Sequence, residues 1–226
     1  MTHPLDRLVW NALTGRHAKF AEGGALARRY RPDIIPFAAA RDTRAESLAA
    51  LAALPEPGEV MVMWDFAPPP LPPGLVTART GTVVQMVLTR EPEAIDDPRV
   101  AALSEADAAA MLALAQLTEP GPFTLKAQAL GTFYGIRLDG RLAAMAGERM
   151  KVDGFSEVSG VCTHPDFRGR GLARLLSVIV TRQILARGET PFLHAWADNA
   201  AAIRLYEQIG FTARTRLSLL AAARPS

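Results

Sequence analysis

The segment Val161–Ala173, VCTHPDFRGRGLA, holds the residue types and spacing best suited to chemistry. A run of strand-forming residues leads through a tight loop into a long apolar helix, and Gly169 and Gly171 stand where that helix begins. Free main-chain N–H groups at a helix start, together with the helix dipole, bind phosphate oxygens. Glycine has no Cβ, so an oxyanion can approach its main chain closely. Further positive charge comes from Arg168, Arg170 and Arg174.

Three kinds of phosphate-binding loop are candidates for this segment. A P-loop requires Gly-Lys-Ser/Thr at its end, which is absent, and a dinucleotide fingerprint would require glycine where Arg174 stands. The remaining pattern, Gln/Arg-x-x-Gly-x-Gly/Ala, is the pyrophosphate loop of acyl-CoA-binding proteins. It is matched by Arg168, Gly171 and Ala173.

With this loop the chain resembles the GNAT acetyltransferase superfamily. A second match, Asn199–Phe211 (NAAAIRLYEQIGF), resembles that superfamily's other signature, and the resemblance covers roughly residues 99–222. It implies an α/β (α+β) fold: a mixed, mostly antiparallel central sheet with helices on both faces. It also implies an enzyme that transfers an acetyl group from acetyl-CoA directly to a primary amine. A glycine N-acyltransferase-like branch is one alternative within the superfamily.

The resemblance assigns the co-substrate to two segments. The main chain of Val161, Cys162 and Thr163 would hold the pantetheine arm as an added strand does, with the Val161 N–H polarising the thioester carbonyl. Tyr206 would hydrogen-bond the departing sulfur. Asn199 is either a cofactor contact or only the N-cap of the following helix. The pyrophosphate would lie on Arg168, Gly169, Arg170, Gly171, Leu172, Ala173 and Arg174.

The amine must attack as the neutral base, and a lysine-like amine has a pKa near 10.4 against about 8 for an α-amine. A carboxylate can remove the proton directly or through water. Two glutamates lie on central strands, and the resemblance favours Glu157 as the base over Glu148. The alternative for each is a solvated strand residue or an ion-pair partner of a nearby arginine.

The other reactive side chains give little evidence of a catalytic or metal-binding role. Cys162 is predicted to be a small buried apolar residue, because no third group completes a Cys–His pair with His164. The four histidines lack ligand spacing, so no metal is expected. His194 either lines the amine pocket or is simply packed.

Composition excludes several classes of protein. The chain has 226 residues, 25 basic against 23 acidic, and a net charge of +2, which leaves no general basic field for nucleic acid. A single cysteine excludes an internal disulfide and a cysteine-rich metal cage. The longest apolar stretch, Leu172–Ala186, is interrupted by polar residues, and no export signal opens the chain. We therefore expect a cytoplasmic protein with no membrane association.

The pattern of elements predicts two units. Residues 1–97 are predicted to form an α/β lobe, with a degenerate copy of the same fold as one alternative, and residues 98–226 to form the acetyltransferase domain. In the second unit, strands at 131–138, 142–150, 155–163, 191–197 and 211–220 accompany helices at 105–117, 172–187 and 200–209. The first unit shows helices near residues 5–13 and 45–54, with strands at 60–66 and 82–89.

The sequence thus predicts an N-acetyltransferase acting on the amine of a small molecule or amino acid. Two alternatives stay open: a protein acetyltransferase acting on a lysine or an N-terminus, and an acyl-CoA-binding sensor without turnover. The N-terminal lobe and the segment TEPGPF–Lys126 are expected to shape the amine pocket. Acyl-chain preference and oligomeric state are also open, a homodimer being one alternative.

Overall fold

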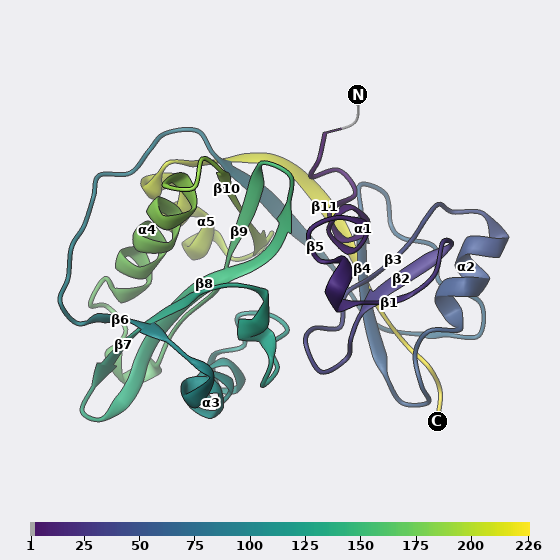
Figure 1. Ribbon diagram of the computed structural model, residues 1–226, viewed down its shortest axis with the longest axis horizontal. Coiled ribbons are helices and arrows are strands. Elements are labelled where there is room, and N and C mark those ends of the chain that lie inside the picture. The colour runs from purple at the N-terminus through teal and green to yellow at the C-terminus, as the bar shows by residue number, and fades with distance from the viewer. Residues whose placement is uncertain (1–2) are drawn as a thin grey trace.

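The computed structural model describes residues 3–226, which are built around an eight-stranded sheet in the order β4-β11-β5-β10-β9-β8-β7-β6 (Figure 1). Neighbouring strands are antiparallel except β10 and β9. This mixed, mostly antiparallel sheet confirms the predicted fold class. The strands are β4 Val60–Asp65, β5 Val76–Leu88, β6 Val100–Leu103, β7 Phe133–Leu138, β8 Arg141–Val152, β9 Phe155–Thr163, β10 Thr190–Trp196 and β11 Phe211–Ala223.

Helices cover both faces of the sheet. On α4 (Leu172–Leu185), Leu176, Val180 and Ile184 recur every four residues and are fully buried, because this spacing aligns them along one helix face. They pack with residues of α5 (Ala200–Ile209) and β8–β10 in one core cluster. A separate cluster joins α3 (Ala108–Thr118) to other side chains of β7–β9. The predicted placement of helices on both faces is confirmed.

The N-terminal residues form a smaller layer beside this arrangement, to the right in Figure 1. Helix α1 (Leu8–Thr14) and helix α2 (Ala45–Ala52) accompany a three-stranded antiparallel sheet. Sequence patterning did not identify that sheet, because its strands are short and rich in Ala and Arg rather than in β-branched residues. The strands are β1 Ala21–Gly23, β2 Ala27–Tyr30 and β3 Ala38–Ala40.

The predicted boundary at residue 98 separates strands that pair in one sheet. β5 comes from the first 97 residues, yet it lies between β10 and β11 of the second unit. The connection from β5 to β6 then passes outside α4 (Figure 1), where Arg182 Nη1 donates to Glu91 Oε1 at 2.8 Å. The division into two domains at residue 98 stays a prediction.

Across residues 3–226, every helix is too short or too polar to span a membrane.

Candidate active site

The two parallel strands at the centre of the sheet separate along their length. β9 and β10 pair only through Phe155–Glu157 and Thr190–Phe192. Beyond Glu157 and Phe192 the register gives no further partners between them within the described chain. A cavity of about 920 Å³ lies where the strands have parted, which is large enough for a small ligand and part of a carrier.

Both segments that the sequence favoured for the amine pocket line this cavity. The end of α3 and the following loop contribute residues 115–116 and 118–123, and the N-terminal residues contribute parts of β4 and β5. In addition to Tyr206 and His194, four aromatic side chains line the cavity and give it apolar walls, and charged side chains of both signs are exposed to it. These four aromatic residues are Phe37, Trp64, Phe123 and Trp196, and the charged residues are Arg79, Arg149, Glu119 and Asp198.

An irregularity in β9 alters the main chain beside the cavity. Ser159 pairs with Gly147 and Cys162 with Met145, so residues 160–161 have no partner in β8. Gly160 supplies the left-handed conformation of this bulge, with φ of 62°. Val161, which lines the cavity, is thereby left without a strand partner on either side. A bulge of this kind exposes main-chain groups that a bound extended ligand can use.

The loop before α4 offers a second set of main-chain groups. Gly169 and Gly171 have φ of 76° and 72°, and an added Cβ would meet nothing within 4 Å at either position. Apart from Arg168, whose N–H donates to Pro165, no N–H from Gly169 to Arg174 has an acceptor in the described chain. These N–H groups therefore point toward open space at the positive end of a fourteen-residue helix.

The remaining predicted cofactor-binding residues differ in how far their side chains are exposed to solvent. Arg168, Arg170 and Arg174 are exposed around the loop, whereas Leu172 is buried in the core beneath it. Ala173 is half-buried in the first turn of α4. Thr163 Oγ1 is buried without a hydrogen-bond partner among residues 3–226.

The Cys162 side chain points away from the cavity. It packs with Met111 and Leu114 of α3, and burial raises its pKa to about 11. A thiol in this state is a poor nucleophile, so Cys162 contributes at most its main chain.

Helix α5 carries two of the predicted residues to the cavity. Asn199 caps the helix, since its Oδ1 accepts the Ala202 N–H at 3.0 Å, and it also lines the cavity. The cap assignment is confirmed, while a cofactor contact stays a prediction. Tyr206 lines the same cavity and is 9% exposed. Burial raises the pKa of Tyr206 to about 12, and no partner in the described residues occupies its hydroxyl.

Glu157 is fully buried, and its carboxylate is fully engaged. Arg149 donates to its two oxygens at 2.6 and 2.9 Å, and the Met150 N–H donates at 3.2 Å. Burial opposes ionisation, but the charge and hydrogen bonds of Arg149, with those of His194, outweigh it and lower the pKa of Glu157 to about 2. These contacts weigh against the predicted base role and match the ion-pair alternative, because so weak a base with no free face cannot readily take a proton from an amine.

The same carboxylate sets the protonation of His194. Arg214 donates to Gln85 Oε1 at 2.7 Å, so the Gln85 amide nitrogen faces His194 Nε2 at 3.1 Å. His194 Nε2 must then accept, which leaves the proton on Nδ1, where it is donated to Glu157 Oε1 at 2.7 Å. His194 lines the cavity, and its ring is packed at a tilt against Trp64 with the ring centres 4.8 Å apart, while a place in an amine pocket stays a prediction.

Glu148 lies outside the cavity lining. Its carboxylate is buried and pairs with Lys151 and Arg187, each at 2.8 Å. Its neighbour Arg149 does line the cavity. Successive residues of a strand face opposite sides of a sheet, so a strand that turns Glu148 away from the cavity turns Arg149 toward it. This alternation is the sequence signal that could have identified Arg149 as a cavity residue. No motif marks Arg79 or the aromatic walls, which sequence reasoning missed.

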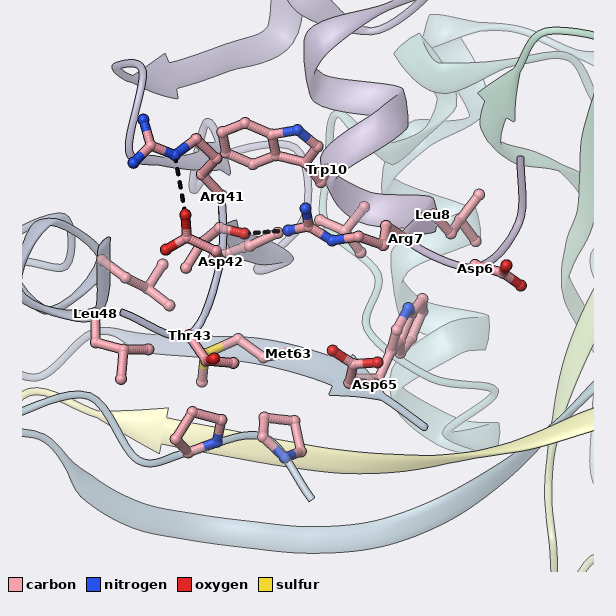
Figure 2. Close-up of a pocket in the computed structure, with 18 residues that line it drawn as sticks. Asp6, Arg7, Leu8, Trp10, Arg41, Asp42, Thr43, Leu48, Met63 and Asp65 are labelled. Atoms are coloured by element: carbon pink, nitrogen blue, oxygen red, sulfur yellow. Dashed lines mark hydrogen bonds and ion pairs between the residues drawn. The ribbon is translucent and has the colours of Figure 1, made fainter. Parts of the chain in front are cut away.

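A smaller cavity of about 300 Å³ lies among the N-terminal residues (Figure 2). Its basic groups are already engaged: Arg41 pairs with Asp42 at 3.2 Å, and Arg7 donates to the Ala40 carbonyl. It lies far from the loop before α4 in sequence and shares with the larger cavity only Trp64. The larger cavity is therefore the candidate active site.

Known proteins resemble this chain both in sequence and in structure. The FR47-like protein family model matches residues 133–219, from β7 into β11. The ribosomal protein bS18-alanine N-acetyltransferase of Salmonella typhimurium is 32% identical over 127 residues, which cover 51% of this chain and 82% of that protein. The chain belongs to the GNAT superfamily of N-acetyltransferases.

Two further similarities place this GNAT enzyme among its relatives. A crystal structure from Novosphingobium aromaticivorans, assigned to the GNAT acetyltransferase family, is 43% identical over the full length of both chains, with a TM-score of 0.94. The mycothiol acetyltransferase of Nocardiopsis dassonvillei is 34% identical over 91 residues, which cover 36% of this chain and 27% of that protein.

GNAT acetyltransferases use acetyl-CoA as co-substrate, and the residues of this chain suit it chemically. A diphosphate needs clustered donors and positive charge, which the exposed N–H groups of residues 169–174 and the surrounding arginines offer. An extended arm needs unpaired main-chain groups, which the bulge at Val161 offers.

Proposed function

We propose that this GNAT enzyme transfers the acetyl group of acetyl-CoA directly to the primary amine of a small molecule or an amino acid. The observation that carries the proposal is the cavity between the separated ends of β9 and β10, onto which both Val161 and Tyr206 open. The diphosphate would lie on the loop from Arg168 to Arg174, and the pantetheine arm along Val161–Thr163.

The proposed reaction forms one bond and breaks another. The amine nitrogen attacks the thioester carbonyl carbon, the C–N bond forms, the C–S bond breaks with its electron pair leaving on sulfur, and the nitrogen loses a proton. The Val161 N–H would polarise the carbonyl oxygen as it gains charge. Tyr206 keeps its proton, because its pKa is about 12, and would donate a hydrogen bond to the departing thiolate.

The amine proton is then left to water in the cavity. Glu157 has no free face for it, and both ring nitrogens of His194 are engaged. The α-amine of a peptide N-terminus, with a pKa near 8, is partly neutral at pH 7, unlike a lysine amine near 10.4. This difference favours an acceptor with an amine of low pKa.

A protein N-terminus is the second candidate acceptor. It is favoured by the similarity to the bS18-alanine N-acetyltransferase, and the small-molecule acceptor by the similarity to mycothiol acetyltransferase. The two candidates differ in the acceptor alone, so one screen of amino acids, small amines and peptides distinguishes them.

The test is the release of free thiol from acetyl-CoA with that panel of amines. We expect turnover with small amines, and a drop in kcat of about 10²-fold for Tyr206→Phe, toward the lower end of acid–base effects, since sulfur is a fair leaving group. Calorimetry should show little change in acetyl-CoA affinity for this variant. Tyr134→Phe, a tyrosine on β7 outside the cavity lining, is the matched control.

Two results would contradict the proposal. If the protein binds acetyl-CoA but releases no thiol with any amine, it is an acyl-CoA-binding sensor without turnover. If thiol is released with peptides alone, the protein is a protein acetyltransferase and not a small-molecule one.

A further inference from the structure

Arg79 on β5 presents a positive charge to the cavity without a carboxylate partner. Its guanidinium carbon lies 4.5 Å from the centre of the Trp196 ring, and both residues line the cavity. The structure gives Arg79 no acid within 4.0 Å among residues 3–226 and leaves it exposed. A stacked guanidinium is held in place while its N–H groups stay free for a ligand.

The ring beneath Arg79 is itself held by a close approach. A Cβ at Gly81 would lie 2.7 Å from Cζ3 of Trp196, so only glycine lets the indole pack against β5 at this point. The pairing of β10 with β5, in which Trp196 stands opposite Val83, fixes the other side of the arrangement. Trp196 is therefore a fixed wall of the cavity, and the Arg79 guanidinium lies over its ring.

The other cationic side chain of the cavity differs in its charge balance. Arg149 lies over the Phe37 ring at 4.9 Å, but Glu157 neutralises its charge at 2.6 Å. Both acidic residues of the lining, Glu119 and Asp198, lack an ion-pair partner in the described residues. The cavity thus offers unpaired charge of both signs beside aromatic walls, which suits a ligand that carries an ammonium, a carboxylate and an apolar body.

We propose that the acceptor is an amino acid, or a similar amine bearing a carboxylate, with an apolar or aromatic body, and that Arg79 binds its carboxylate. This inference rests on the proposed function and narrows it. An amide or a peptide carries no carboxylate near its amine and would leave Arg79 unpaired.

The experiment compares L-phenylalanine, L-phenylalaninamide and phenethylamine as acceptors, by thiol release at saturating acetyl-CoA. For each enzyme the ratio of kcat/KM for the acid to that for the amide is measured. In Arg79→Gln we expect this ratio to fall about 10- to 100-fold, the range for a charge-assisted hydrogen bond, mainly through KM of the acid. Dividing the two enzymes' ratios cancels the different intrinsic reactivities of the two amines.

Two further variants sharpen the comparison. Arg79→Lys keeps the charge but loses the planar fork, so its ratio should lie between those of the wild type and Arg79→Gln. Arg216→Gln removes an exposed arginine on β11 outside the cavity lining, and its ratio should equal that of the wild type.

The outcomes separate this inference from the proposed function. If the amines are acetylated but Arg79→Gln leaves the acid-to-amide ratio of kcat/KM unchanged, the role of Arg79 is overturned. Acetyl transfer to small amines then still stands. If phenylalanine and its analogues are all inert but amines without carboxylates or apolar bodies react, the substrate class is wrong. Absence of turnover with every amine overturns the proposed function itself.

Discussion

At the scale of single residues, the state of Glu157 is set by its neighbours and not by its residue type. A glutamate on a central strand is an obvious base, yet Arg149, His194 and the Met150 N–H surround its carboxylate. These contacts hold Arg149 beside the cavity and keep the proton of His194 on Nδ1. We therefore propose that Glu157 positions these two side chains and does not take the amine proton.

Glu157→Gln should lower stability in a pH-dependent way. Removing the acid leaves the Arg149 charge nearly buried without its partner, which costs about 3 kcal/mol. Because the folded pKa of about 2 lies below the ordinary value of 4.5, the ion pair contributes fully above pH 4.5 and is lost as pH falls toward 2. Urea unfolding of both proteins between pH 3 and 7 should therefore show a difference that is largest near neutrality and shrinks in acid.

The control for this prediction is Asp166→Asn, which breaks an exposed pair with Arg141. It should change the free energy of unfolding by less than about 0.5 kcal/mol. A Glu157→Gln protein as stable as the wild type, with turnover alone lost, would restore the base role to Glu157.

At the scale of elements, the start of α4 combines two features that a pyrophosphate-binding loop needs. The glycines adopt left-handed conformations, and the helix that follows is long enough to keep its first N–H groups unpaired and aligned. An alanine in either glycine position would be strained by about 1 kcal/mol and would disturb the N–H groups.

Gly171→Ala should therefore weaken acetyl-CoA binding by about 10-fold, as measured by calorimetry, because the strain is relieved by moving the loop. Gly140→Ala is the matched control. Gly140 has φ of 74° with open space around it, but it lies in the β7–β8 turn, so its substitution should cost similar stability and leave the affinity unchanged. Equal losses of affinity in both variants would show that the loop before α4 has no special part in binding.

At the scale of the whole molecule, the two predicted units share the sheet that forms the cavity. β5 supplies Val84 and Met86 to the core under α4 and α5, and it pairs with both β10 and β11. A chain without β5 would leave those two strands with unpaired edges and would lose part of that core.

We therefore expect a fragment of residues 98–226 to be unfolded or aggregated when expressed alone. The full chain should unfold in one transition, seen alike by circular dichroism and by tryptophan fluorescence. A soluble fragment with its own cooperative transition would show that the division at residue 98 is a true domain boundary.

The sequence by itself determined the features that depend on local patterns. The loop Arg168–Ala173, the cap at Asn199 and most strands and helices of residues 100–220 follow from neighbours along the chain, whose spacing sets backbone conformation and periodicity. Each of these features needs only a few consecutive residues, and such residues are read directly.

Only the tertiary structure decided what surrounds each functional side chain. Arg149 reached Glu157 through strand pairing, Gln85 reached His194 across 109 positions, and Arg79 came to the cavity because β5 inserted between β10 and β11. Charge state, exposure and pocket shape depend on contacts between residues far apart in the chain. Those contacts leave no spacing pattern in a single sequence, and for that reason the phosphate loop could be predicted while the acceptor pocket could not.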